Sequence, residues 1–370
     1  MIMDEKAIIA GISQGDINGI GYEVIIKSLI DPQINDICIP VVYGSPKVAA
    51  YHRKALNINN FSFNNIRVAE EAHSKKANMI NCLDDNIRVE LGKSTPQGGE
   101  AALISLEKAV EDLVSGKIDV LITAPIDKNN IQSETFRFKG HTDYLKSVAK
   151  VEEILMFMIS ENMRIGMATD HVPLNKVSEM ITVEKLIHKL RLMNQSLIRD
   201  FGIRKPRIAV LGLNPHAGDN MLIGNEEGDV IIPAIKLAEK EGIMTFGPYP
   251  SDGFFGAGSF AKFDGILAMY HDQGLAPFKA LSFDSGVNFT AGLPFVRTSP
   301  VHGTAFDIAG RGEASENSFR QAIYLACDIY RNRKMYAEIS KNPLKHQDID
   351  IHYDRVDELP PDVYNSEHAL

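Results

Sequence analysis

The stretch GILAMYHDQGLAPFKALSFDSGVNFTAGLPFVRTSPVHGTAFDIAGRG, residues 265–312, decides how the fold of the chain is interpreted. Its first six residues are apolar, which is typical of one buried strand, and this run stops at His271 and Asp272. Two ionisable side chains are therefore expected at the carboxyl end of a strand, where open α/β sheets bind their ligands. Glycines and prolines interrupt the remainder, which favours backbone folded closely around a small ligand over long regular elements.

Three residues farther along the same stretch suit an anionic ligand. Lys279 offers an ammonium point charge, Asn288 an orienting carboxamide, and Arg297 a planar guanidinium that can bind phosphate or carboxylate through two hydrogen bonds. We therefore expect a small-molecule site within residues 265–312.

The composition is that of an ordinary soluble globular protein, with 370 residues of which 44% are hydrophobic and 24% charged. A chain of this length exceeds the size at which one core usually stops growing, so two domains are expected. The net charge of −9 argues against a nucleic-acid partner, because binding to the phosphate backbone needs a basic face. Acidic residues near the start, and the absence of any apolar run of membrane-spanning length, predict a cytoplasmic protein without a membrane partner.

Strands and helices are expected to alternate along the first third of the chain. Apolar runs predict strands at residues 7–12, 39–43 and 119–123. Amphipathic patterns predict helices at residues 47–56 and from Gly98 onward. The polar, Asn-rich residues 57–95 are expected to form short antiparallel strands or irregular structure. This alternation indicates an α/β fold.

Three apolar runs, each predicted to be a strand, end next to His171, His216 and His271. The runs occupy residues 164–169, 207–213 and 265–270. Because the carboxyl ends of parallel strands meet at one edge of a sheet, the three imidazoles can converge although they are far apart in sequence. Neutral imidazoles bind divalent transition metals, so these histidines are candidate ligands. For each histidine taken alone, a hydrogen-bonded loop or core residue is the alternative.

His141 and Thr142 follow Gly140 and precede a helical pattern. Thr142 is expected to cap this helix, and the free backbone N–H groups of the first turn would then attract an anion. Capping without any ligand is the alternative.

Seven motifs together resemble the 4-hydroxythreonine-4-phosphate dehydrogenase family of vitamin B6 biosynthesis, which lies in the isocitrate/isopropylmalate dehydrogenase-like superfamily. They are GDINGIG, GHTDY, TDHVPL, GLNPHAGD, MYHDQGL, GVNFTAGLPFVRTS and HGTAFDIAG. The resemblance spans most of residues 7–333. The sequence departs from the family at Ile17-Asn18, where Pro-Ala is usual, and in the polar tail from about residue 335.

The resemblance implies a fold of two α/β/α domains of the isocitrate/isopropylmalate dehydrogenase-like type with a cleft between them. The first domain would comprise residues 1–140 and 301–370, with a nucleotide-binding loop at 302–311. The second, residues 141–300, would carry the metal histidines. The resemblance also implies a homodimer with a shared active site, in which the partner supplies His171.

The implied activity is NAD(P)-dependent oxidation of 4-phosphohydroxy-L-threonine at its 3-hydroxyl. Metal-assisted β-decarboxylation to 3-amino-2-oxopropyl phosphate would follow, on the route to pyridoxal 5'-phosphate. The resemblance makes His171, His216 and His271 the ligands of one divalent metal, and three imidazoles favour zinc over magnesium, manganese or cobalt. It places the phosphorylated substrate on His141, Thr142, Lys279, Asn288 and Arg297. It places the cofactor on His302, Gly303 and Asp307.

Three points stay open. Lys279 and Asp272 are both candidates for the catalytic group that removes the hydroxyl proton, and Lys279 is equally a candidate phosphate ligand. Asp307 can accept hydrogen bonds from the ribose hydroxyls of NAD and would repel the 2'-phosphate of NADP, so NAD is expected, although Arg311 could pair with that phosphate. The competing functions are a related dehydrogenase of a non-phosphorylated hydroxy acid, a metallohydrolase that activates water, and a non-catalytic binding protein.

Overall fold

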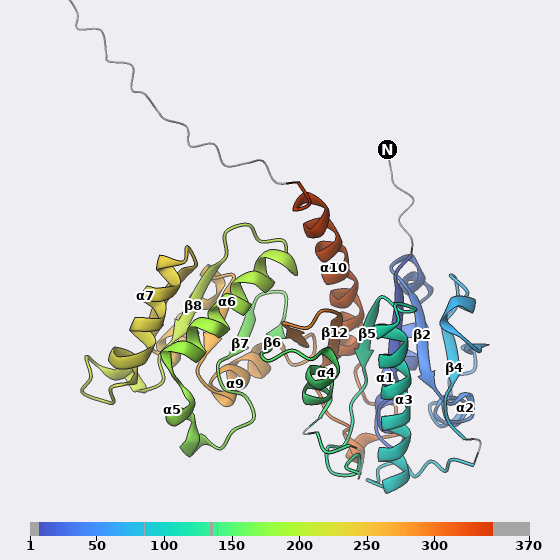
Figure 1. Cartoon of the computed structure of the whole chain (residues 1–370). Helices are drawn as coiled ribbons and strands as arrows, with labels where there is room; N and C mark the ends of the chain where they lie inside the picture. The colour runs from blue at the N-terminus through green and yellow to red at the C-terminus, as the bar shows by residue number, and fades with distance from the viewer. Residues whose placement is uncertain (1–6, 85, 134–135, 139, 343–370) are drawn as a thin grey trace, which may run out of the picture.

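The computed structural model describes residues 7–84, 86–133, 136–138 and 140–342, and within them twelve strands form one sheet with helices on both faces (Figure 1). The α/β prediction is confirmed. The strands are β1 (Ile9–Ser13), β2 (Ile39–Gly44), β3 (Asn64–Ile66), β4 (Asn78–Asn81), β5 (Val120–Thr123), β6 (Leu155–Ile159), β7 (Arg164–Met167), β8 (Arg207–Leu211), β9 (Met244–Tyr249), β10 (Gly265–Ala268), β11 (Val287–Ala291) and β12 (Val296–Pro300). The α-helices are α1 (Gly21–Leu29), α2 (Pro46–Ala55), α3 (Pro96–Val114), α4 (His141–Ala149), α5 (Val177–Met180), α6 (Val183–Arg199), α7 (Ile232–Lys240), α8 (Ser251–Gly256), α9 (His271–Ser282) and α10 (Asn317–Ile339).

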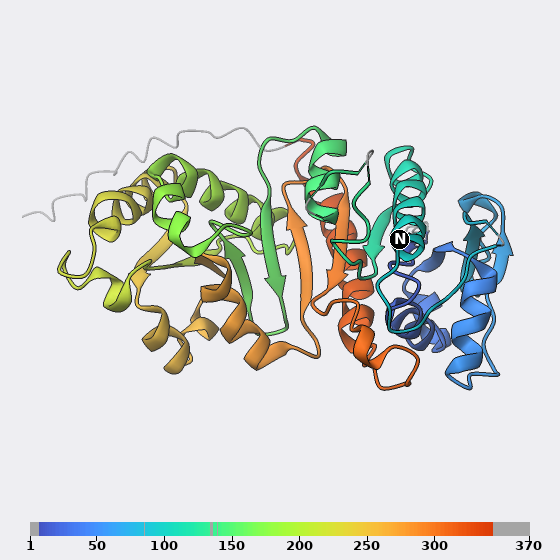
Figure 2. The ribbon, with the colours of Figure 1, turned by 90° about the horizontal axis from the view of Figure 1, so that it is seen from below.

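The strand order is β3-β4-β2-β1-β5-β12-β11-β6-β7-β10-β8-β9. The outer neighbours pair in parallel, whereas β12 with β11, β11 with β6, and β6 with β7 are antiparallel. Because three successive antiparallel pairs separate them, the two parallel halves of the sheet run in opposite directions. Figure 2 shows the central strands β6, β11 and β12 lying between the two halves.

Several helices begin where the sequence places a hydroxyl side chain. Ser45, Thr95 and Thr182 each accept a hydrogen bond from the backbone N–H three residues later, at the starts of α2, α3 and α6. A proline follows the cap at the start of α2 and of α3, where its missing N–H costs nothing. The helices expected from residue 47 and from Gly98 are therefore confirmed, one or two residues earlier than predicted.

Alternate residues of the strands face two separate layers of helices. Val120 and Ile122 belong to a core on one face that also contains residues of α1, α6 and α10, whereas Leu121 belongs to a core on the other face that contains residues of α3 and α4. In the second half of the sheet, Met156 and Met158 face α8 and α9 on the same side as Leu121. The face that carries α4 and α9 holds the cavity described below.

Two expectations about local structure were wrong. Strands β3 and β4, within residues 57–95, pair in parallel and not antiparallel. Residues 265–312 are largely regular, because they form β10, the twelve-residue helix α9, β11 and β12. Gly274 is one cause of that error: it belongs to α9, where a Cβ would lie 3.0 Å from the side chain of Ile165 and 3.2 Å from that of Ala268. The glycine allows α9 to pack closely on the sheet and does not break the helix.

The predicted domain boundaries stay a prediction. The sheet continues through both parts, since β12, inside the predicted second domain of residues 141–300, pairs with β5 of the first. Among the described residues, no helix combines the length and the apolar character required to cross a membrane.

Candidate active site

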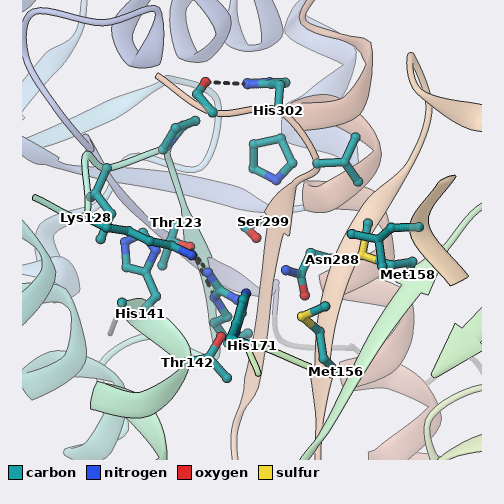
Figure 3. Close-up of a pocket in the computed structure, with 18 of the residues that line it drawn as sticks. Thr123, Lys128, His141, Thr142, Met156, Met158, His171, Asn288, Ser299 and His302 are labelled. Atoms are coloured by element: carbon teal, nitrogen blue, oxygen red, sulfur yellow. Dashed lines mark hydrogen bonds between the residues drawn. The ribbon is translucent and has the colours of Figure 1, made fainter. Parts of the chain in front are cut away.

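A cavity of about 260 Å³ lies over the central strands, between α4 and α9 (Figure 3). Strand register explains its floor, because Met158, Asn288 and Ser299 stand side by side across β6, β11 and β12. Arg297, two residues before Ser299 on β12, points to the same face. The floor is therefore made of strand faces at the point where the two halves of the sheet meet.

Helix α9 forms one wall of the cavity. His271, Leu275 and Lys279 all line it, and their spacing of four residues puts them on one face of the helix. The helix therefore brings together a histidine and a lysine that the sequence alone placed in irregular backbone. Asp272, on the next position of the helix, is not among the residues that line the cavity.

Arg297 lies at the base of the cavity, with only 2% of its surface exposed. Its Nε and Nη2 atoms donate hydrogen bonds to Thr123 Oγ1, at 3.1 and 2.7 Å. Its buried Nη1 atom has no partner in the described part of the chain. Burial lowers the pKa of the guanidinium to about 10, which still leaves it positively charged near neutral pH. A buried cation with a free donor indicates that an anionic ligand completes its hydrogen bonds.

His141 and Thr142 line the opposite wall. The prediction that Thr142 caps α4 was wrong: the cap is Gly140, whose φ of 152° favours glycine, and Thr142 lies within the first turn. Burial, followed by the positive charges of Arg297 and Lys128, holds the pKa of His141 well below its usual range, so the imidazole is neutral near neutral pH. Its buried Nε2 atom has no partner within the described residues, as is also true of Asn288 Oδ1.

Lys128 and Thr123 belong to the site but were not predicted from the sequence. Lys128 lines the cavity and extends into it in Figure 3, and it makes no ion pair with any described residue. Burial, and then the positive charge of Lys128, lowers the pKa of His171. The segment APIDK follows β5 directly, so the strand-end reasoning that selected the histidines could also have selected this lysine.

Two of the three predicted metal histidines lie together. The ring centroids of His171 and His271 are 5.6 Å apart, and both rings line the cavity. His271 Nδ1 and Asp272 Oδ1 share a hydrogen bond of 2.7 Å, which leaves Nε2 of that imidazole for another ligand. The paired imidazoles therefore fit a divalent transition ion by their chemistry.

His216 is exposed and does not line the cavity. Over the part of the chain that the structure describes, no group of three or more His, Cys, Asp or Glu side chains has a metal-holding arrangement. His171, predicted to come from a partner, thus lies beside His271 in the same chain, and His216 is the histidine that stands apart.

The predicted nucleotide loop borders the same cavity. His302 and Gly303 line it, whereas Asp307 is exposed in a short turn, Phe306–Ile308, and does not. Burial lowers the pKa of His302, and its Nε2 atom is buried without a partner among the described residues. The backbone N–H of Ile20 donates to Thr304 O at 3.0 Å, so this loop packs against the turn between β1 and α1.

The family model of the pyridoxal phosphate biosynthetic protein PdxA matches residues 36–326. The chain belongs to this family. It is 53% identical over 347 residues to the 4-hydroxythreonine-4-phosphate dehydrogenase of Bacteroides thetaiotaomicron, covering 93% of this chain and 95% of that relative. It is also similar to a putative D-threonate 4-phosphate dehydrogenase of Oceanobacillus iheyensis, with 40% identity over 88% of this chain and 99% of that relative.

The fold agrees with solved structures of the same family. A 4-hydroxythreonine-4-phosphate dehydrogenase from Klebsiella pneumoniae superposes with a TM-score of 0.76 at 34% sequence identity, covering 88% of this chain and all of that one. The family named from the seven sequence motifs is therefore confirmed. The roles of the individual site residues stay predictions.

Proposed function

We propose that this protein oxidises 4-phosphohydroxy-L-threonine at its 3-hydroxyl with NAD and releases carbon dioxide from the resulting β-keto acid. The product would be 3-amino-2-oxopropyl phosphate, a precursor of pyridoxal 5'-phosphate, and the reaction would take place in the cytoplasm. The observation that carries the proposal is the buried, unpartnered Nη1 atom of Arg297 on the cavity floor, in a chain of the PdxA family.

The phosphate would be bound on the cationic side of the cavity. Arg297 offers its unpartnered Nη1 atom, Lys279 an ammonium on the α9 wall, and neutral His141 a ring nitrogen. Thr142 and Asn288 add polar atoms nearby. These groups lie on strands and helices, so binding of a remote phosphate can orient the reacting carbon without a large ordering cost.

His171 and His271, with His216 as the third ligand, would hold the divalent metal, for which three imidazoles favour zinc over magnesium, manganese or cobalt. A divalent ion at this position supplies Lewis acidity toward the substrate hydroxyl and later the ketone. Asp272 would orient His271 through their hydrogen bond and not act on the substrate. Lys279, which lines the cavity, is then the candidate for removing the hydroxyl proton, a role that requires the neutral amine and is the alternative to binding the phosphate as an ammonium.

His302 and Gly303 would contact the cofactor, because they line the cavity beside the substrate groups. Asp307 makes no hydrogen bond or ion pair with a described residue, so its carboxylate is free to accept from the ribose hydroxyls of NAD. The same charge would repel the 2'-phosphate of NADP.

The active form would be a homodimer in which the second copy completes the metal site. Because His171 and His271 lie together in one chain, His216 is the ligand that we assign to the partner. Mixed dimers of alanine variants test this assignment: a dimer of His216→Ala with His171→Ala or His271→Ala regains one complete site. A dimer of His171→Ala with His271→Ala stays inactive. Rescue in that last combination would contradict the assignment.

D-threonate 4-phosphate is the second candidate substrate, since the relative from Oceanobacillus iheyensis is named for it. The reaction itself is tested by following NADH and carbon dioxide together. We expect one of each per molecule of 4-phosphohydroxy-L-threonine, with no turnover after chelation. Oxidation without carbon dioxide, or turnover by the chelated protein, would overturn the proposal.

A further inference from the structure

The loop that carries His216 has an unusual backbone. Six consecutive residues after β8 have positive φ angles, His216 55°, Ala217 51°, Gly218 81°, Asp219 41°, Asn220 55° and Met221 72°. Left-handed backbone is unfavourable for every residue type except glycine, so such a run persists only where its surroundings impose it. The residues packed against the loop are therefore expected to hold this backbone in place.

Glu227 contacts this loop from the start of the π-helical turn Glu227–Ile231, which precedes α7. Its Oε1 atom accepts hydrogen bonds from the backbone N–H groups of Leu213 and Asn214, both at 2.7 Å. Its Oε2 atom accepts from Asn214 Nδ2 at 2.9 Å. Only 3% of Glu227 is exposed, and these three donors satisfy a carboxylate that is withdrawn from water.

Two glycines leave the space that this carboxylate occupies. A Cβ at Gly212 would lie 3.1 Å from Oε1 of Glu227, and a Cβ at Gly218 would lie 2.7 Å from Oε2. The carboxylate is thus wedged between the end of β8 and the middle of the left-handed run. It is hydrogen-bonded to the loop where the loop begins, and it packs against Gly218, two residues beyond His216.

We propose that Glu227 is the positioning residue for His216: by holding the backbone before His216 through hydrogen bonds and packing against Gly218 after it, it sets the direction in which the imidazole is presented to the metal. This inference rests on the proposed role of His216 as a metal ligand. The Glu227 carboxylate accepts three hydrogen bonds from the loop itself, so we assign it to the loop and not to the metal or the substrate. Groups that orient a metal ligand in this way are typically worth roughly 10- to 100-fold in metal affinity.

The preceding residue provides a matched control. Glu226 accepts from Ser178 Oγ at 2.5 Å and from Asn214 Nδ2 at 2.8 Å, whereas the backbone N–H groups of Leu213 and Asn214 donate to Glu227. Replacing Glu226 with Gln removes the same charge one position away while leaving the backbone anchor in place.

The test is a titration of the full-length, metal-free protein with Co2+, followed by calorimetry and by the visible absorption of the bound ion. We expect Glu227→Gln to weaken Co2+ binding by roughly 10- to 100-fold and to change the absorption band, which reports the ligand geometry. The KM for NAD should be unchanged. Glu226→Gln should bind Co2+ as the wild type does.

Wild-type affinity and absorption in Glu227→Gln would overturn the inference, as would an equal loss in Glu226→Gln. If Glu227→Gln does not fold, Glu227→Asp serves instead: it keeps the charge but is too short to reach both backbone donors, so the loss should persist. Unchanged binding by the aspartate variant would likewise overturn the inference. A His216→Ala variant that binds Co2+ like the wild type would contradict the metal role of His216 and not the anchoring by Glu227.

Discussion

Thr123 is a residue whose role is visible only in the structure. Its hydroxyl accepts both hydrogen bonds of the Arg297 guanidinium, so it fixes the cation at the base of the cavity. Thr123→Val keeps the shape but removes the acceptor, and hydrogen bonds to charged groups contribute about 1.5–3 kcal/mol. We expect the KM for the phosphorylated substrate to rise roughly 10- to 100-fold, while the KM for NAD stays unchanged.

Thr298→Val is the control for this measurement. Thr298 is also fully buried on the central strands, but its hydroxyl donates to Ala322 O on the other face of the sheet. This variant should lower stability without raising the substrate KM. An equal rise in KM in both variants would show that Thr123 acts only through the packing of the sheet.

His52 makes the stability of the protein depend on pH. Its ring is 1% exposed, its Nε2 contacts Ile17 O at 2.7 Å, and burial lowers its pKa to about 4. Between pH 6.5 and pH 4 the unfolded chain therefore binds a proton that the folded one refuses, so stability falls as the pH falls through this window. At pH 4.5 this group lowers the free energy of unfolding by about 2 kcal/mol.

His52→Gln removes the titrating group and keeps a donor for Ile17 O. The free energy of unfolding, measured with urea, should differ between pH 7 and pH 4.5 by about 2 kcal/mol less in this variant than in the wild type. His188→Gln, at an exposed position on α6, should leave the difference as it is in the wild type. If His52→Gln also leaves the difference in unfolding free energy between the two pH values unchanged, the loss of stability at low pH comes from other groups.

At the level of elements, the sequence predicted the strands well and the helix α9 poorly. The apolar runs before His171, His216 and His271 are β7, β8 and β10. Strand ends are legible because a buried run stops at a polar residue. Gly274 and Pro277 conceal α9, since both residues usually interrupt helices, whereas here close packing on β7 and β10 outweighs their local cost. The shared face of His271 and Lys279 followed from that helix and so could not be predicted.

The helical phase of Lys279 can be tested by moving its charge along α9. In Lys279→Ala with Ala280→Lys the net charge is kept, but the ammonium turns by one helical position away from the cavity. We expect the KM for the phosphorylated substrate to rise roughly tenfold or more. The single variant Ala280→Lys, which keeps Lys279, should behave as the wild type. A doubly substituted protein with a normal KM would mean that the charge acts at long range and not through contact.

For the whole molecule, the family and the α/β class were predictable, but the place where the halves meet was not. The motifs that identify the family are short and local, as are the apolar runs. The reversal of strand direction at β11 and β6 depends on pairings between residues more than 100 positions apart, such as Asn288 with Met158. This pairing places Asn288 on the cavity floor beside Ser299. The expectation that ligands bind at strand ends therefore identified the histidines from the sequence, but it did not identify which residues form the cavity floor.

The separation of His216 from the other two histidines is a second property of the whole molecule. Strand order puts β10 between β7 and β8, so all three histidines follow neighbouring strands, as predicted. The left-handed run after β8 then determines where His216 lies, and Glu227 holds the start of the loop that contains this run. Side-chain contacts of this kind leave no periodic pattern in the sequence.

The central claim is that the cavity recognises a phosphorylated hydroxy amino acid for oxidation by NAD. The most direct measurement is kcat/KM from NADH formation, with 4-phosphohydroxy-L-threonine, 4-hydroxy-L-threonine and D-threonate 4-phosphate compared under identical metal and cofactor conditions. We predict the highest value for 4-phosphohydroxy-L-threonine and a loss of at least about 100-fold without the phosphate, because the buried Arg297 would keep an unmatched charge. Equal values with and without the phosphate would contradict the claim.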